Sequence, residues 1–167
     1  MIIVKIDDLA FYDGEAIARP VTAELGPTTG LLRRLEQAAG EALLRQLRLQ
    51  EPLPVGSAIV TGAGALAVEL LIHAVVMSDR EPVSESNVKR AVQSALQRAS
   101  DWQIGRVAFP PFGLGAGNLD IEDSARIMIE TMRRHQAVST HPGEITVVVE
   151  NDDERAAFEW CLTRGIA

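Results

Sequence analysis

Residues 109–120 read FPPFGLGAGNLD, with two prolines, three alternating glycines and an acidic residue before an amphipathic stretch. Glycine has no side chain, so backbone N–H groups in such a loop can close around a pyrophosphate. The loop follows a short apolar strand and precedes a helix, where α/β sheets usually bind ligands. Its spacing matches neither a Walker loop, which ends in Gly-Lys-Ser/Thr, nor a dinucleotide fingerprint. The glycines alone do not distinguish a loop that binds an anion from a plain tight connection between a strand and a helix.

A second glycine-containing stretch, GPTTG at residues 26–30, also stands ahead of a helical pattern. Thr28 or Thr29 could cap that helix, which is the simpler interpretation. The first N–H groups of the helix could also face a phosphate. Two such loops, each before a helix, indicate an anion site more strongly than either does alone.

Asp7 and Asp8 follow the first apolar run. A carboxylate at a strand end can accept a hydrogen bond from an exocyclic amine such as that of adenine, although a solvated turn is the simpler alternative. The other reactive side chains favour structural roles. His73 lies in an apolar strand and is expected in the core, His135 and His141 lack a partner at metal spacing, and Cys161 is expected to pack beside Trp160.

Composition limits the partners of the chain. Its 167 residues carry a formal charge of −7, whereas general binders of nucleic acid or anionic membranes are usually basic. An acidic protein can still bind an anion locally through backbone N–H groups. A single cysteine excludes an internal disulfide, and no apolar run reaches the roughly 20 residues that span a membrane. These features predict a cytoplasmic protein with neither nucleic acid nor membrane as a partner.

Short apolar runs alternate with longer amphipathic stretches, which predicts an α/β fold with helices on both faces of a sheet. Pro20 cannot donate to a strand ladder and is expected at a strand end or edge. The chain is expected to form one domain over residues 1–167. Strands are expected at residues 2–6, 15–21, 57–61, 68–77, 106–109 and 145–149, and helices at 28–49 (divided at Gly40), at 83–100 with Ser84 as N-cap, after Asp120 and after Asn151.

Three stretches together resemble the macro domain family of ADP-ribose-binding modules. SAIVTGAGALAVELLIHAVV is similar to the family's central pair of strands, and FPPFGLGAGNLDIEDSARIM to its strand, second phosphate loop and following helix. IDDLAFYDGEAIARPV resembles its opening segment and second strand. The resemblance implies a three-layer α/β/α fold with a mixed central sheet and a ligand cleft at the strand ends.

The resemblance also implies a set of binding residues. Asp8 matches the adenine-binding aspartate, with Leu9 offering its backbone N–H, and residues 113–117 match the loop around the pyrophosphate and distal ribose. Residues 26–30 align with the family's first glycine-rich loop, where the family has a longer run of glycines. The expected ligand-binding residues are Asp8, Leu9, Thr22, Gly26, Thr28, Thr29, Gly30, Gly113, Leu114, Gly115, Ala116, Gly117 and Asn118.

The chain departs from the family where catalytic members act. The family's Asn-Ala-Ala-Asn motif is replaced here by Arg19, Pro20, Val21 and Thr22. The catalytic aspartate of some family members aligns near Leu32. Pro27 removes an N–H from the first loop, and no aromatic residue follows the last strand to stack on adenine. The sequence therefore predicts a binding module for ADP-ribose or a related adenine nucleotide, with no catalytic residue, metal or cofactor. A weak ADP-ribosyl or O-acetyl-ADP-ribose hydrolase and a scaffold with a vestigial pocket remain alternatives, and a homodimer is left open.

Overall fold

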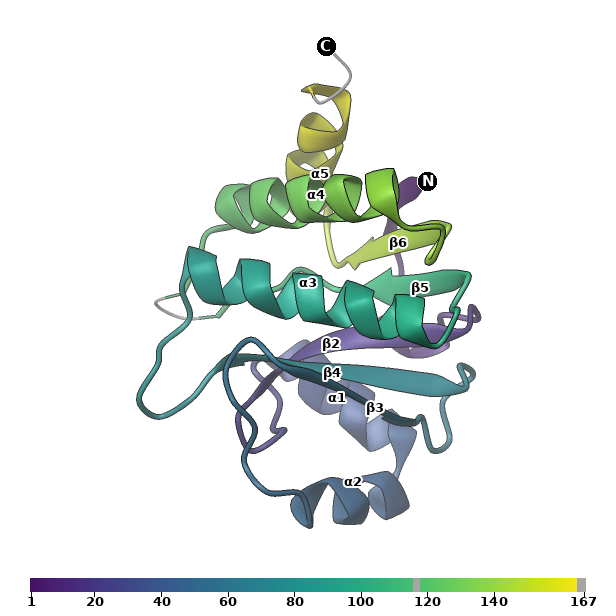
Figure 1. Ribbon diagram of the computed structural model, residues 1–167, viewed down its shortest axis with the longest axis vertical. Coiled ribbons are helices and arrows are strands. Elements are labelled where there is room, and N and C mark those ends of the chain that lie inside the picture. Colours follow the sequence, from purple (N-terminus) through teal and green to yellow (C-terminus); the bar gives the residue numbers. More distant parts are fainter. Residues whose placement is uncertain (116–117, 165–167) are drawn as a thin grey trace.

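A computed structural model describes residues 1–115 and 118–164, and its strands and helices alternate along the chain (Figure 1). The predicted order of elements is confirmed, including the division of the first long helix at Gly40, whose φ is 99°. The elements are β1 (Ile2–Ile6), β2 (Ala16–Thr22), α1 (Gly30–Ala39), α2 (Glu41–Arg48), β3 (Ala58–Gly62), β4 (Leu70–Met77), α3 (Glu85–Asp101), β5 (Arg106–Phe109), α4 (Ile121–Val138), β6 (Glu144–Val149) and α5 (Asp152–Arg164).

The strands form one mixed sheet in the order β1-β6-β5-β2-β4-β3. All neighbouring strands are parallel except β3 and β4, which form an antiparallel pair. The expectation that β3 and β4 are both central is wrong, because β3 lies at the edge and β4 beside it. Strands β5 and β6 lie in the interior, so their carboxyl ends bring the segments after Phe109 and Val149 together.

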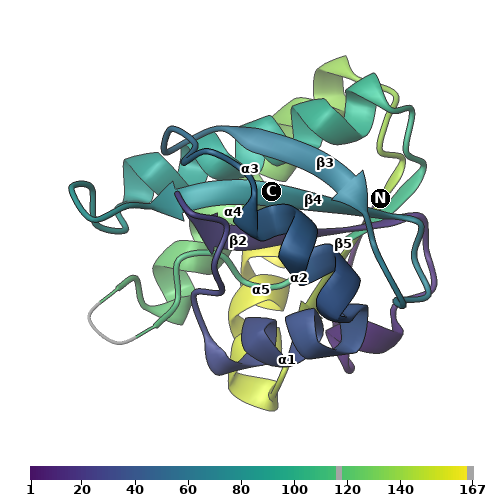
Figure 2. The ribbon, with the colours of Figure 1, turned by 90° about the horizontal axis from the view of Figure 1, so that it is seen from below.

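Helices cover both faces of the sheet, which confirms the three-layer α/β/α fold. Figure 2 shows α1 and α2 on one side of the strands and α3 and α4 on the other. Helix α5 packs on α4 and on the edge strand β1. Each face buries its own aliphatic core: Ala91, Val92 and Leu96 belong to the core under α3 and α4, and Leu32 and Leu35 to the core under α1. Burial of these aliphatic side chains is the main force that holds the layers together.

Pro20 does not lie in an edge strand, which corrects its predicted position. It sits in the interior strand β2, opposite Ala74 of β4. Strand β5 pairs with β2 only at Ala16 and Ile17, so Pro20 has no β5 residue paired with it. A residue without an N–H is tolerated there because the neighbouring ladder has already ended.

Side-chain caps begin α3, α4 and α5 as the sequence predicts. Ser84 accepts a hydrogen bond from the backbone N–H of Asn87, and Asp120 accepts one from that of Asp123, at the starts of α3 and α4. Glu154 donates its backbone N–H to Asn151 ahead of α5. Each cap satisfies a donor that the helix itself leaves open, which fixes where the helix starts.

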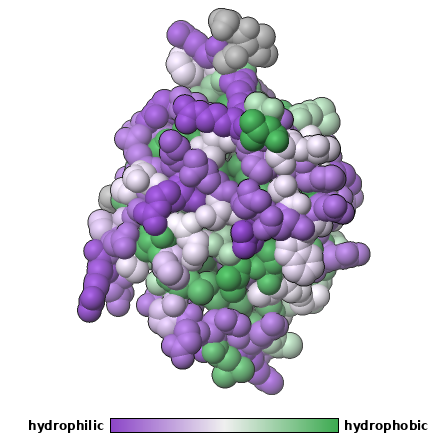
Figure 3. Space-filling view, viewed as in Figure 1, coloured by the Kyte–Doolittle hydropathy of each residue, from purple (hydrophilic) through white to green (hydrophobic). Residues whose placement is uncertain are grey.

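The outer face over α3 and α4 is largely hydrophilic, with hydrophobic side chains gathered lower, over the region of β3 and β4 (Figure 3). Among the described residues, no helix combines the length and apolar character needed to cross a membrane.

Candidate functional site

The first loop, residues 22–30, is a tight turn closed by its own hydrogen bonds. Leu25 donates its backbone N–H to the carbonyl of Thr22 over 2.8 Å, and Thr22 donates to the carbonyl of Gly26 over 3.1 Å. The Thr22 hydroxyl accepts a further bond, 3.1 Å long, from the N–H of Gly26. Leu25 has a φ of 66°, a conformation that costs a branched side chain energy and must be held by its surroundings.

Arg19 of β2 holds this loop from inside the protein. Its side chain is only 1% exposed, and its Nη2 donates to the carbonyl of Leu25 over 3.1 Å. Its Nη1 donates to Oε1 of Glu36 on α1 over 2.5 Å, and its Nε donates to Nδ1 of His73 on β4 over 3.0 Å. Burial lowers the pKa of the Arg19 guanidinium, while Glu36 opposes that shift. One buried cation therefore joins the loop to α1 and the sheet.

His73 is a buried core histidine, as the sequence predicts. Its Nδ1 accepts from Arg19, so Nε2 carries the proton and donates to the hydroxyl of Thr61 over 2.8 Å. That hydroxyl in turn donates to the carbonyl of Gly62 over 2.8 Å. Burial, and after it the charge of Arg19, lower the pKa of His73 well below its ordinary value. A neutral, fully bonded ring of this kind supports structure, because it has no open position for a substrate.

Helix α1 begins directly after the first loop. The hydroxyl of Thr29 accepts from the backbone N–H of Leu32 over 3.5 Å, which confirms Thr29 as the N-cap. Within residues 1–115 and 118–164, the N–H groups of Gly30 and Leu31 donate to no protein acceptor. Open donors at the start of a helix, together with the helix dipole, favour a negatively charged ligand there.

The described residues of the second loop, 110–115 and 118–119, are held by backbone bonds and by side chains, since the Ser124 hydroxyl of α4 donates to the carbonyl of Phe112 over 2.6 Å. Leu119 donates its N–H to the carbonyl of Gly113 over 3.0 Å, and Asn118 donates to the carbonyl of Gly115 over 3.1 Å. Gly113 and Gly115 have φ values of 85° and 131°, which favour glycine. The Asn118 amide donates to the carbonyl of Leu114 over 3.3 Å. The expected ligand-binding residues Ala116 and Gly117 lie outside the described residues.

The two loops lie next to each other. A Cβ atom at Gly115 would lie 3.7 Å from the backbone carbonyl oxygen of Thr28. Beside this meeting point is a cavity of about 400 Å³, called here the α1 cavity. Its walls come from the start of α1, the second loop and the segment after β6: Thr29, Gly30, Leu31, Leu32, Arg34, Pro110, Pro111, Leu114, Glu150 and Glu154.

An ion pair crosses the rim of the α1 cavity. Nη2 of Arg34 lies 3.1 Å from Oε1 of Glu150. Both side chains are substantially exposed, at 66% and 47%, so the pair contributes little to stability. Glu154 accepts a 2.9 Å bond from the backbone N–H of Glu150. The cavity thus has N–H donors and a guanidinium on the α1 side, with carboxylates opposite.

The predicted binding residues separate into three groups. Thr29, Gly30 and Leu114 line the α1 cavity. Thr22, Gly26, Thr28, Gly113, Gly115 and Asn118 form the loops beside it without lining it. Asp8 and Leu9 lie elsewhere.

Asp8 lines a separate cavity of about 280 Å³ with Phe11, Tyr12 and Arg106. Its Oδ1 accepts a 3.0 Å bond from the N–H of Ala10 and caps the short 3₁₀ turn Leu9–Phe11. Leu9 is buried at 1% exposure in the core under α1. A contact between adenine and Asp8 stays a prediction, and one oxygen of that carboxylate already serves the turn.

Sequence reasoning missed Arg34 and Glu150 as cavity residues. Arg34 lies four residues after Gly30, so both occupy one face of α1 and the guanidinium reaches back over the helix start. Glu150 directly follows β6, where parallel strands place ligands. These two positional rules could have found both residues.

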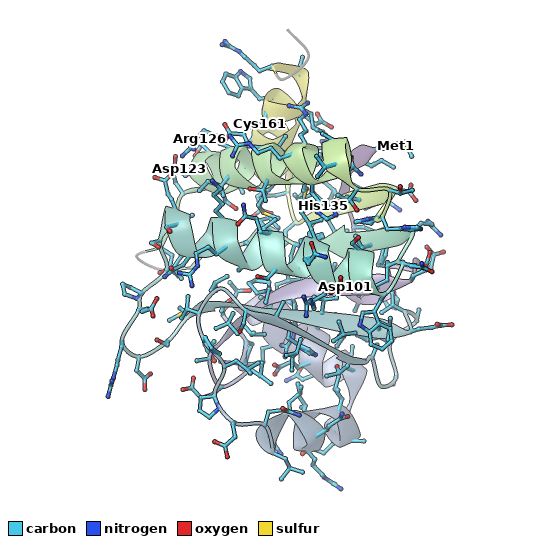
Figure 4. The ribbon with its side chains drawn as sticks, viewed as in Figure 1. Met1, Asp101, Asp123, Arg126, His135 and Cys161 are labelled. Atoms are coloured by element: carbon cyan, nitrogen blue, oxygen red, sulfur yellow. The ribbon has the colours of Figure 1, made fainter. Side chains whose placement is uncertain are left out.

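Cys161 packs as predicted and lies apart from this region. It contacts the core beneath α3 and α4, and burial raises the pKa of its thiol. Figure 4 shows Cys161 with Asp123 and Arg126 where α4 meets α5. A thiol with a raised pKa is a weak nucleophile at neutral pH, which favours a packing role.

Solved structures with the same fold include macrodomains. The Oceanobacillus iheyensis macrodomain with ADP superposes with a TM-score of 0.86, 20% identity, and coverage of 98% of this chain and 90% of that one. The Trypanosoma brucei macrodomain in complex with ADP-ribose gives a TM-score of 0.85 and 18% identity over 96% of this chain and 68% of that one. At these identities the likeness concerns the fold.

Sequence relatives extend the comparison. An uncharacterised protein of Mycobacterium tuberculosis is 27% identical over 158 residues, which are 95% of this chain, and the chain spans 44% of that relative's length. An uncharacterised protein of Aquifex aeolicus is 32% identical over 143 residues, 85% of each chain. The model of the macro domain family matches residues 20–128. The match begins within β2, ends within α4 and includes both loops, and the chain belongs to the macro domain family.

Proposed function

We propose that this chain is a binding module for ADP-ribose or a related adenine nucleotide, with the diphosphate held at the α1 cavity. The observation that carries the proposal is the meeting of open N–H donors at Gly30 and Leu31 with the guanidinium of Arg34 in one cavity beside the second loop. Macrodomains with the same fold are described with ADP and with ADP-ribose, which supports the choice of ligand.

The charge distribution is compatible with this ligand. The chain carries a formal charge of −7, so a diphosphate gains nothing from the overall field of the protein. Local donors must supply the attraction, and neutral N–H groups at a helix start do so without added charge. We propose a cytoplasmic protein that binds neither nucleic acid nor a membrane surface, as its acidity and single cysteine predict.

The same residues argue against hydrolysis. Leu32 lines the cavity near the position of the family's catalytic aspartate, and its apolar side chain cannot orient a water molecule. The hydroxyl of Thr22 already accepts from Gly26. A scaffold role would be favoured by a cleft filled with side chains such as Arg19 or Leu32. Leu32 lines the α1 cavity and Arg19 does not, and the cavity has a volume of about 400 Å³. Binding without catalysis is therefore the function we propose.

Titration calorimetry with ADP-ribose tests the proposal. Wild-type protein is expected to give saturable heat, and Gly115→Glu to lose it, because the new carboxylate would enter the meeting point of the two loops beside Thr28. Gly62→Glu is the matched control, since a Cβ at Gly62 has no neighbour within 4 Å among the described residues. Asp8→Ala tests the predicted adenine contact separately. No saturable heat from wild type at millimolar ligand would overturn the proposal.

A further inference from the structure

Two hydroxyls of the first loop already accept hydrogen bonds from the backbone. The Thr22 hydroxyl accepts from Gly26, and the Thr29 hydroxyl caps α1. Arg19 directs its donors inward, to Leu25, Glu36 and His73. Ribose hydroxyls gain affinity only where the protein offers matching polar groups, and Arg19 is not among the residues that line the α1 cavity.

Arg34 lies beside the open N–H groups at the start of α1. Its ion pair with Glu150 uses Nη2. The other terminal nitrogen, Nη1, lies 3.8 Å from where a Cβ atom at Gly30 would stand, directly over the start of α1. In the described residues Nη1 makes no hydrogen bond. A cationic donor and the open N–H groups of Gly30 and Leu31 therefore face the same part of the cavity.

We propose that the α1 cavity selects a nucleoside diphosphate with a free terminal phosphate over ADP-ribose. The inference rests on the proposed function, since it concerns the ligand of the same site. A free terminal phosphate carries nearly one more negative charge at pH 7.5 than a phosphate esterified to a sugar, because its last ionisation falls near pH 6. Arg34 can take up that charge in a charge-assisted hydrogen bond. A distal ribose would remove the charge that Arg34 can bond.

Competitive calorimetry with ADP, ADP-ribose and AMP, in metal-free buffer at pH 7.5, tests this selectivity. Wild type is expected to bind ADP roughly 5- to 10-fold more tightly than ADP-ribose, the difference that one charge-assisted contact supplies. Arg34→Gln is expected to bring the ratio close to one. Arg33→Gln is the matched control, because Arg33 is the next residue on α1, is exposed and does not line the cavity. The control should keep the wild-type ratio.

A change of pH provides an independent readout. The terminal phosphate of ADP gains a proton between pH 7.5 and 5.5, so the preference for ADP should shrink over that interval while ADP-ribose affinity changes less. Tighter binding of ADP-ribose than of ADP, or an unchanged ratio in Arg34→Gln, would overturn the selectivity alone. Binding of none of the three nucleotides would overturn the proposed function and the selectivity with it.

Discussion

The two loops beside the α1 cavity reach a fixed shape by different means. The first loop is supported from within by side chains, chiefly Arg19, whose guanidinium is 1% exposed and bonds to Leu25 and Glu36. The second loop combines one buried side-chain bond, from Ser124 to Phe112, with backbone bonds to the carbonyls of Gly113 and Gly115, whose positive φ values suit glycine. The first loop should therefore be sensitive to a lost polar partner and the second to an added side chain.

The largest effect is expected from Arg19→Met. Methionine fills a similar volume but leaves Glu36, the carbonyl of Leu25 and Nδ1 of His73 without their donor. Removing one member of a buried ion pair costs about 3–5 kcal/mol. Urea unfolding should show this loss, whereas Arg33→Met on the exposed side of α1 should stay within about 0.5 kcal/mol of wild type.

A second substitution sharpens this prediction. Removing both charges is less costly than leaving one unpaired, so adding Glu36→Leu to Arg19→Met should recover part of the lost stability. Equal loss in Arg19→Met and Arg33→Met would show that the buried network does not support the first loop.

The second loop should respond to Gly113→Ala. A Cβ atom there would lie 2.7 Å from Cγ2 of Val88, and alanine is strained at a φ of 85°. Strain and overpacking together should cost about 2–4 kcal/mol. Gly62→Ala serves as the control, because a Cβ atom at Gly62 meets nothing within 4 Å among the described residues. If both variants unfold at the same urea concentration, steric fit at Gly113 is not what shapes the second loop.

The network behind the first loop should also make stability depend on pH. Burial and the charge of Arg19 hold the pKa of His73 well below its ordinary value of about 6.5. As pH falls below 6.5, His73 binds a proton in the unfolded chain but stays neutral in the folded one, so the folded state loses stability. From pH 7.5 to 5.5 the loss should be about 1.4 kcal/mol.

His73→Gln isolates this contribution, because glutamine does not titrate and its amide can still bond to Arg19 and Thr61. Urea unfolding of both proteins across this pH range measures the difference. If the two pH profiles run parallel, His73 takes a proton as readily in the folded state as in the unfolded one.

The sequence predicted the elements and the two loops, because these depend on local patterns: apolar periodicity, N-caps and glycine. It also identified His73 as a core residue. It could not reveal that Arg19 bonds to His73, Glu36 and Leu25, since those partners meet only when β2, β4 and α1 pack together.

Contacts between residues far apart in the sequence also determine the positions that the sequence analysis predicted wrongly or missed. Pro20 was expected at a strand end or edge, yet it lies in an interior strand because β5 is short. The ion pair of Arg34 with Glu150 joins residues 116 positions apart, which no local pattern encodes. The positions of Arg34 and Glu150 could be inferred singly, but their pairing across the α1 cavity depends on the fold.

The smallest effect is expected from Thr22→Val, and it should be confined to the first loop. Thr22→Val keeps the shape of the side chain but removes the hydroxyl that accepts from the N–H of Gly26 over 3.1 Å. Losing one such bond should cost about 1 kcal/mol and speed hydrogen exchange at the Gly26 amide, with no change at the amide of Leu119 in the second loop. Thr163→Val, which removes an exposed hydroxyl on α5, is the control and should leave both amides unchanged. Faster exchange at Leu119 in Thr22→Val would mean that the two loops are held as one unit, because support lost behind one would then be felt in the other.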